Sequence, residues 1–169
     1  HPLSVVTAIT VQDTSGVDDV LPIDPEWVVD QARAMLEDVP VAAFKIGLLG
    51  SVENIAAIAE VLADYPDIPL VLDPVLASGR GDELADEDML DAMRELLIPQ
   101  STIITPNSME ARRLAETDED DAPTPAACAE RLLATGVEYV LITGTHEPTP
   151  QVVNTLYGKG GVVRADTWQ

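Results

Sequence analysis

Short apolar runs alternate with amphipathic stretches along most of this chain. Runs rich in β-branched residues predict strands at residues 4–12, 41–46, 70–73, 102–105, 139–143, 152–157 and 162–165. Apolar residues at helical spacing predict helices that begin after the caps Asp24 and Ser51, near Glu87, at Ser108 and at Thr124-Pro125. Residues 13–22, which include Gly16, are interpreted as a connection.

The order of these elements indicates an α/β fold. Repeated alternation of strand and helix is typical of a parallel sheet packed with helices. The strand at 41–46 is expected to be buried, and the strand at 70–73 is continuously apolar until it ends at Asp73, as expected when helices cover both faces of a strand. The last two strands, joined by Gly158-Lys159-Gly160-Gly161, predict a C-terminal β-hairpin. We therefore expect a single domain over residues 1–169.

Composition narrows the class of protein. The chain has 169 residues, 46% of them hydrophobic, which suits one packed domain and argues against disorder. No apolar run is long enough to cross a bilayer, and residues 1–4 lack the pattern of a signal peptide. The single cysteine, Cys128, excludes an internal disulfide, and its amphipathic surroundings favour a packed thiol over a nucleophile. These features predict a cytoplasmic protein.

The charge is strongly negative. The chain has thirty acidic and nine basic residues, which gives a formal net charge of -21. A surface of this sign repels nucleic acid and anionic lipid, so neither is expected as a partner. It also repels ATP unless a metal ion or a group of backbone amides offsets the field.

Two strand ends carry the chemistry. Each is a brief apolar run that stops at a polar residue beside a proline: Asp73 with Pro74, and Asn107 after Pro106. Glu110 follows one helical turn after Asn107. A strand-end Asp-Pro alone is usually a turn. Because ligands of an open parallel sheet bind outside the carboxyl ends of its strands, the two ends together predict a rim of oxygen ligands for magnesium and phosphate.

Five sequence blocks carry a resemblance to a known family. They are TAITVQDT with Gly16-Val17 (from residue 7), KIGLLG (45–50), VLDPV (71–75), TPN with Glu110-Ala111 (105–111) and GTH (144–146). In order and spacing the set resembles the hydroxymethylpyrimidine/phosphomethylpyrimidine kinases of thiamine biosynthesis, members of the ribokinase-like superfamily. The resemblance covers essentially the whole chain. It implies a three-layer α/β/α sandwich, with the mostly parallel sheet and C-terminal hairpin already predicted.

The resemblance also implies an activity and a set of site residues. The activity is ATP-dependent phosphorylation of the hydroxymethyl group of a small pyrimidine, and then of its monophosphate. Matched by position, Gln12 would read the pyrimidine edge. The other implied residues are pocket walls at Thr10, Leu48 and Val75, magnesium ligands at Asp73 and Glu110, and nucleotide contacts at Asn107, Thr143, Gly144 and His146. The implied cofactors are ATP and Mg²⁺, the partner is the small-molecule pyrimidine, and a homodimer is a further expectation.

The chain departs from the family pattern in three places. The family begins with a strand and a glycine-rich turn that helps to hold the substrate, and this chain starts after them, at His1. A later Gly-Thr-Gly-Cys type of turn supplies the anion hole and the base, and this chain stops before it, at Gln169. We therefore expect no catalytic base within these residues and little or no kinase activity from this chain alone. Thr143 replaces a lysine that many relatives direct at the ATP phosphates.

Several alternatives stay open. Gln12 could satisfy a loop amide, His146 could be a surface histidine, and Lys45 could be the ion-pair partner of Asp73. At the level of function, a pyridoxal kinase of the same superfamily and a non-catalytic binding or scaffold domain are the two competing interpretations. Gly158-Lys159-Gly160-Gly161 opens no helix and is not interpreted as a phosphate-binding loop.

Overall fold

A computed structural model describes residues 1–78, 81–115, 123–144 and 151–168. The strands are β1 (Ala8–Gln12), β2 (Val17–Pro22), β3 (Phe44–Ile46), β4 (Leu70–Leu72), β5 (Ile103–Ile104), β6 (Tyr139–Ile142), β7 (Val152–Gly158) and β8 (Gly161–Trp168). The helices are α1 (Pro25–Asp38), α2 (Val52–Ala63), α3 (Glu87–Ala92), α4 (Ser108–Leu114) and α5 (Pro125–Ala134). After α3 the chain continues as a π-helical segment over Met93–Leu97 and a short 3-10 turn over Ile98–Gln100.

The helix starts follow the capping residues that the sequence predicts. The side chain of Asp24 accepts a hydrogen bond from the backbone of Glu26, and Pro25 occupies the first turn of α1. Ser51 caps α2 through Asn54, and Thr124 caps α5 through Ala127. These side chains satisfy backbone N–H groups that have no partner inside the helix.

The described strands form a six-stranded sheet in the order β3-β4-β5-β6-β7-β8, and a separate two-stranded ribbon, β1-β2. Strands β3 to β6 are parallel, and β7 and β8 continue the sheet in antiparallel register. The predicted α/β class, the mostly parallel sheet and the C-terminal hairpin are confirmed. None of the helices in the described ranges has the length and apolar character needed to cross a membrane.

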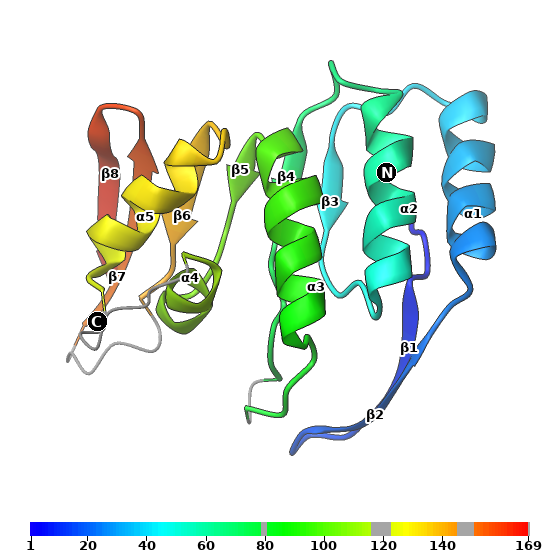
Figure 1. Cartoon of the computed structure of the whole chain (residues 1–169), viewed down its shortest axis with the longest axis horizontal. Coiled ribbons are helices and arrows are strands. Elements are labelled where there is room, and N and C mark those ends of the chain that lie inside the picture. The colour runs from blue at the N-terminus through cyan, green and yellow to red at the C-terminus, as the bar shows by residue number, and fades with distance from the viewer. Residues whose placement is uncertain (79–80, 116–122, 145–150, 169) are drawn as a thin grey trace.

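Helices α2, α3 and α5 lie over the same face of the sheet (Figure 1). Right-handed crossovers between strands that follow one another in a single direction place every connecting helix on one side. The described residues therefore contribute two of the three expected layers, the sheet and one helical layer.

The hydrophobic core fills the space between the sheet and these helices. Leu70, Leu72 and Ile104 point toward the helices and are at most 2% exposed. Val71 and Ile103, which alternate with them, face the other side and are only partly buried. The expectation that helices cover both faces of the strand at 70–73 is thus wrong for the described part of the chain.

The N-terminal region differs most from the prediction. Residues 13–22, interpreted as a connection, contain β2, which pairs with β1 in a ribbon that projects beyond the carboxyl ends of the parallel strands (Figure 1). The strand expected from residue 4 begins only at Ala8. Asp18 and Asp19 lie exposed on β2, and this polar pair hid the strand from a search for apolar runs. Strand β3, expected to be buried, is an edge strand with an exposed central residue, Lys45.

Candidate functional site

The structure brings the ends of β5 and β6 together, as the sequence predicts. Asn107 pairs with Thr143 in a short parallel bridge just beyond the two strands. The backbone N–H of Ser108 donates to the carbonyl oxygen of Thr143 over 3.2 Å, and the N–H of Thr143 donates to Pro106 over 3.0 Å. Asn107 and Thr143 are therefore neighbours on the rim formed by the carboxyl ends of the parallel strands.

Asn107 and Glu110 form a capping box at the start of α4. The Oδ1 atom of Asn107 accepts hydrogen bonds of 2.9 Å from the backbone N–H groups of Met109 and Glu110. In return, Oε2 of Glu110 accepts from the backbone N–H of Asn107 over 2.8 Å, and Oε1 accepts from Leu76 over 3.4 Å. Because both carboxylate oxygens already accept backbone bonds, Glu110 joins the loop after β4 to the start of α4.

Asp73 lies at the end of β4 and pairs with Lys45 of β3. The Nζ atom of Lys45 is 2.9 Å from Oδ2 of Asp73, and both side chains are partly exposed. The ion pair considered for Lys45 is confirmed. The second carboxylate oxygen, Oδ1, accepts no hydrogen bond from any described residue, and the side chain of Asp73 is 39% exposed.

The donor set suits a metal ion only in part. Within the described ranges, no group of three or more histidine, cysteine, aspartate or glutamate side chains is arranged to hold a metal. Of the two predicted magnesium ligands, Asp73 and Glu110, only Asp73 has a carboxylate oxygen, Oδ1, that accepts no hydrogen bond from a described residue. A magnesium ion here would have to complete its coordination with water and with phosphate oxygens, which is the usual arrangement at phosphate-transferring sites.

The residues expected to line a pyrimidine pocket come from the ribbon and two strand-end loops. Thr10 and Gln12 lie on β1, Leu48 follows β3, and Val75 follows β4. Gln12 is exposed, and its side chain makes no hydrogen bond to another described residue. No described contact therefore supports the alternative in which the side chain of Gln12 hydrogen-bonds to a loop amide.

Two contacts hold the ribbon near this rim. The hydroxyl of Thr7 donates to the carbonyl oxygen of Leu48 over 2.6 Å. The backbone N–H of Val17 donates to Oδ2 of Asp82 over 3.2 Å. The first contact lies at the base of the ribbon and the second at the turn between its strands.

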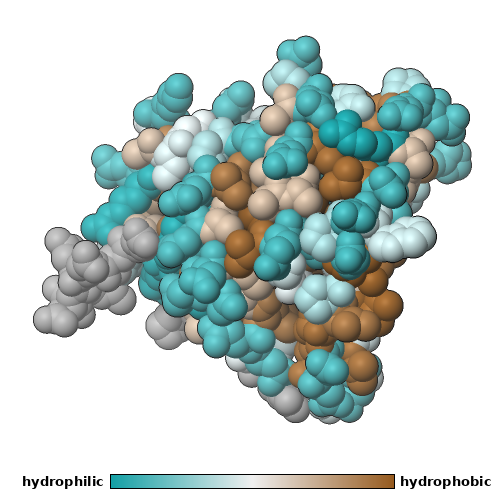
Figure 2. Space-filling view, turned by 45° about the vertical axis from the view of Figure 1, so that its right-hand side comes forward, coloured by the Kyte–Doolittle hydropathy of each residue, from teal (hydrophilic) through white to brown (hydrophobic). Residues whose placement is uncertain are grey.

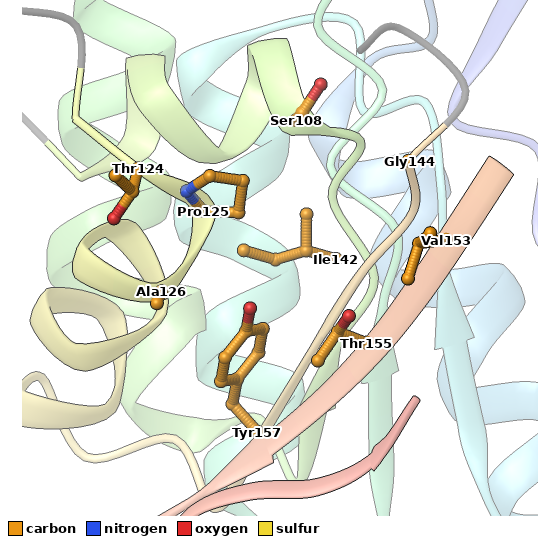
Figure 3. A pocket seen from close by; sticks show the side chains of 9 residues that line it. All are labelled: Ser108, Thr124, Pro125, Ala126, Ile142, Gly144, Val153, Thr155 and Tyr157. Carbon is orange, nitrogen blue, oxygen red and sulfur yellow. The ribbon is translucent and has the colours of Figure 1, made fainter. Parts of the chain in front are cut away.

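A pocket of about 280 Å³ lies beside Gly144, between α4, α5, β6 and β7. Figure 3 shows Pro125, Ile142 and Tyr157 facing one another across it. Ser108 also lines the pocket; it is 1% exposed, and its hydroxyl finds no partner in the described part. The pocket adjoins the candidate nucleotide residues Thr143 and Gly144. His146 lies outside the described residues.

Sequence reasoning missed two residues that organise the rim, Asn54 and Asp82. Asn54 is fully buried, and its Nδ2 lies 3.1 Å from each of three carbonyl oxygens, those of Thr7, Ile23 and Leu49. A signal was present, because Asn54 shares the helical stripe of Ile58 and Val61. A polar residue on an apolar stripe indicates a buried hydrogen-bonding role. No local sequence pattern indicated that Asp82 would accept a hydrogen bond from the ribbon.

Comparison with known proteins identifies the family. The sequence profile of phosphomethylpyrimidine kinase matches residues 1–169. The chain belongs to the phosphomethylpyrimidine kinase family. A hydroxymethylpyrimidine/phosphomethylpyrimidine kinase of Mycobacterium bovis is 40% identical over 147 residues, which are 86% of this chain and 54% of the relative. The resemblance inferred from the five sequence blocks is confirmed.

Solved structures agree with this assignment. Phosphomethylpyrimidine kinase from Clostridium difficile matches with a TM-score of 0.81 and 33% identity, over 97% of this chain and 69% of that one. A Bacillus subtilis pyridoxal kinase, solved as an ADP complex, matches with a TM-score of 0.78 and 29% identity, over 97% and 62%. The ribokinase-like fold class is therefore confirmed. The chain spans about half the length of the curated relatives that it matches, 54% in the Mycobacterium bovis case.

Proposed function

We propose that this chain is the core of a kinase that uses ATP to phosphorylate hydroxymethylpyrimidine, and then its monophosphate, in thiamine biosynthesis. One observation carries the proposal: in a member of the phosphomethylpyrimidine kinase family, Asn107 and Thr143 are neighbours at the strand ends where ligands of parallel sheets bind. Phosphoryl transfer depends mainly on positioning and charge neutralisation, and a strand-end rim of polar groups suits both.

The ribbon and the loops after β3 and β4 would hold the pyrimidine. In this proposal Gln12 reads the edge of the ring, because a side-chain amide offers one donor and one acceptor side by side. Its exposed position at the end of β1 leaves both groups without a protein partner among the described residues. Thr10, Leu48 and Val75 would form the walls.

Asn107, Thr143, Gly144 and His146 would contact the nucleotide. Asp73 would be the direct magnesium ligand, since its Oδ1 is without a described partner. Glu110 would act through water, because both of its oxygens accept backbone bonds. Bound magnesium would neutralise phosphate charge, which a chain with a net charge of -21 cannot do with its own surface.

The proposal assigns little or no turnover to the 169-residue chain by itself. The chain spans 54% of the Mycobacterium bovis relative. In this proposal the anion-hole turn and the base that the resemblance implies would belong to the remaining length. The residues present would bind and orient the reactants, and the groups that complete phosphoryl transfer would have to come from the remaining length. The cytoplasmic location and the homodimer stay predictions.

The decisive experiment measures ADP release from MgATP with hydroxymethylpyrimidine and, separately, with pyridoxal. It compares the 169-residue chain with a version extended at both ends to the length of the family's members. We expect turnover on the pyrimidine from the extended protein, a large loss of that turnover in its Asp73→Asn variant, and little or none from the short chain. Turnover of the short chain equal to that of the extended one would contradict the assignment of the catalytic groups.

Pyridoxal kinase is the second candidate. A pyridoxal kinase is among the structural neighbours at 29% identity, so the fold is compatible with that substrate too. Faster turnover of the extended protein on pyridoxal than on the pyrimidine would favour the pyridoxal kinase interpretation. A folded extended protein that turns over neither substrate would instead support the non-catalytic binding or scaffold interpretation.

A further inference from the structure

The β1-β2 ribbon projects from the body of the protein with little packing to hold it. Ile9, Val11 and Leu21 are 53%, 58% and 62% exposed. Figure 2 shows apolar side chains reaching the surface on the side of the molecule that carries α1 and the ribbon. Because side chains this exposed gain little from burial, hydrogen bonds decide where the far end of the ribbon lies.

One hydrogen bond joins the far end of the ribbon to the rest of the described chain. The backbone N–H of Val17 donates to Oδ2 of Asp82 over 3.2 Å. Apart from it, no hydrogen bond between described residues connects residues 8–22 to another part of the fold. In Figure 1 the tip of the ribbon lies beside the loop between β4 and α3, which carries Asp82.

The residue held by this hydrogen bond is the cross-strand partner of Gln12. Gln12 and Val17 face each other in the register of the ribbon. The turn between them is bonded within itself, since Oδ1 of Asp13 accepts from the backbone N–H groups of Ser15 and Gly16 over 2.7 and 3.1 Å. A contact that fixes Val17 therefore also fixes Gln12.

The carboxylate of Asp82 is itself held in place by Ser78. The hydroxyl of Ser78 donates to Oδ2 of Asp82 over 2.8 Å and accepts from the backbone N–H of Asp82 over 3.0 Å. The backbone N–H of Ser78 donates to the carbonyl oxygen of Asp82 over 2.8 Å, and Ala77 and Glu83 form an antiparallel bridge next to this pair. Asp82 thus offers the ribbon an acceptor whose position is set by its own loop.

The loop that carries Asp82 begins at the candidate site. It follows Asp73 and Val75 at the end of β4, and the backbone N–H of Leu76 donates to Oε1 of Glu110 over 3.4 Å. The hydrogen bond from Val17 to Asp82 therefore connects the ribbon to the segment that holds the candidate magnesium ligand.

We propose that Asp82 is a positioning residue for the pyrimidine substrate. It acts through the pair of Val17 and Gln12, and it keeps the side chain of Gln12 at the rim beside the loop after β4. This inference rests on the proposed function, in which Gln12 reads the edge of the pyrimidine. It assigns Asp82 to recognition of the pyrimidine and not to binding of the nucleotide.

Steady-state kinetics of the extended protein test the proposal. Asp82→Ala removes the acceptor for Val17, and we expect the KM for hydroxymethylpyrimidine to rise about tenfold, as for loss of one hydrogen bond to a charged group. The KM for ATP should stay within about twofold of that of the unmodified protein. Asp82→Asn keeps a side-chain oxygen that can accept the same hydrogen bonds, so its KM for the pyrimidine should stay close to the unmodified value.

Two further variants control for charge and for folding. Asp18→Ala removes an exposed carboxylate from the strand of Val17 but leaves the hydrogen bond to Asp82, so it should leave both KM values unchanged. Ser78→Ala keeps the carboxylate and removes the hydroxyl that orients it. It should raise the KM for the pyrimidine by a smaller factor than Asp82→Ala, and it gives a measurement if the Asp82→Ala protein does not fold.

A double variant separates positioning from a general loss of structure. When Asp82→Ala is added to Gln12→Ala, the KM for the pyrimidine should change by less than about twofold, because the contact that Asp82 positions is already absent. A general loss of structure would instead have its full effect in both backgrounds.

Amide exchange tests the hydrogen bond itself, with no substrate present. In the ¹⁵N-labelled 169-residue chain, Asp82→Ala should speed exchange of the Val17 backbone amide by about tenfold or more, and Asp18→Ala and Asp82→Asn should not. Failure of this inference is therefore distinguishable from failure of the proposed kinase activity.

Any one of the following results would overturn the proposal. They are an unchanged KM for the pyrimidine in folded Asp82→Ala, equal changes in the KM values for pyrimidine and ATP, and a defect in Asp82→Asn as large as that in Asp82→Ala. A full additional effect of Asp82→Ala in the Gln12→Ala background and an unchanged exchange rate of the Val17 amide would do the same.

Discussion

The side-chain Nδ2 of Asn54 donates to the carbonyl oxygen of Thr7 over 3.1 Å, and so fixes the base of the β1-β2 ribbon to the first turn of α2. The same nitrogen lies equally close to the carbonyl oxygens of Ile23 and Leu49. One buried amide therefore joins both ends of the ribbon to the loop after β3. The ribbon carries the candidate pyrimidine residues Thr10 and Gln12, so their position depends on a residue outside the site.

Replacement of Asn54 by alanine should destabilise the fold substantially. The variant removes this donor from three carbonyl oxygens, of which that of Thr7 still accepts from the N–H of Ile23. An unsatisfied buried polar group costs about 1–3 kcal/mol before relaxation. We expect the free energy of unfolding in urea to fall by about 2–3 kcal/mol. The matched control is Glu53→Ala, which changes the exposed neighbour on the same turn. A difference between the two variants of less than about 0.5 kcal/mol would contradict the role given to Asn54.

Gly144 should tolerate no side chain, because the backbone of β7 passes directly over it. A Cβ atom at this position would collide with the carbonyl oxygen of Val153 and lie 3.0 Å from its nitrogen. We expect Gly144→Ala to lower the free energy of unfolding by about 1–3 kcal/mol, the usual cost of overpacking. Gly160→Ala is the control, since a Cβ there meets nothing within 4 Å. Equal stability of the two variants would show that β7 shifts freely.

Two variants of Asn107 separate its capping role from the proposed nucleotide contact. Asn107→Ala removes the acceptor for two backbone N–H groups of α4, which should cost about 0.5–2 kcal/mol of stability. Asn107→Asp keeps a capping oxygen and should retain stability. In the extended protein, Asn107→Asp should nevertheless weaken ATP binding, measured by calorimetry, because it adds negative charge beside the phosphates. Unchanged affinity in a stable Asn107→Asp variant would argue against the nucleotide contact.

Salt should stabilise this protein. With a formal net charge of -21, repulsion between carboxylates opposes the compact state. We expect Tm to rise between about 0.01 M and about 1 M NaCl, over which the screening length falls from roughly 30 Å to roughly 3 Å. Sucrose at matched osmolarity is the control, because it is excluded from protein surfaces without screening charge. A Tm that is indifferent to NaCl would show that the acidic residues lie too far apart to repel one another.

The regular elements were predictable where apolar spacing and capping residues agree. Helix α1 illustrates this, with Asp24, Pro25 and a helical stripe all pointing to the same start. Strand β2 was not predictable, because Asp18 and Asp19 face solvent on a ribbon that contributes little to the core. The edge position of β3 could not be inferred either, since the sequence of a parallel strand does not show whether it has a neighbouring strand on one side or on both.

The sequence predicted which residues lie on the rim, but not the hydrogen bonds that join the rim to the rest of the fold. Strand-end chemistry predicted Asn107 at one edge of the sheet and the family resemblance implied Thr143 as a nucleotide contact, and the structure makes the two residues direct neighbours. The sequence could not distinguish the two roles of Glu110, because a capping box and a metal ion both use the same side-chain carboxylate. The contact between Asp82 and Val17 joins residues 65 positions apart, and only the folded topology brings them together.

Within the described sheet, each strand from β3 to β7 pairs with the strand that follows it in the chain. The β7-β8 hairpin closes a short turn, whereas each parallel pair from β3 to β6 closes a longer crossover that contains one or more helices. Domains begin to fold during synthesis from the N-terminal side. In the described sheet each new strand leaves the ribosome after the strand it pairs with, so every pairing from β3 to β8 has its partner already synthesised.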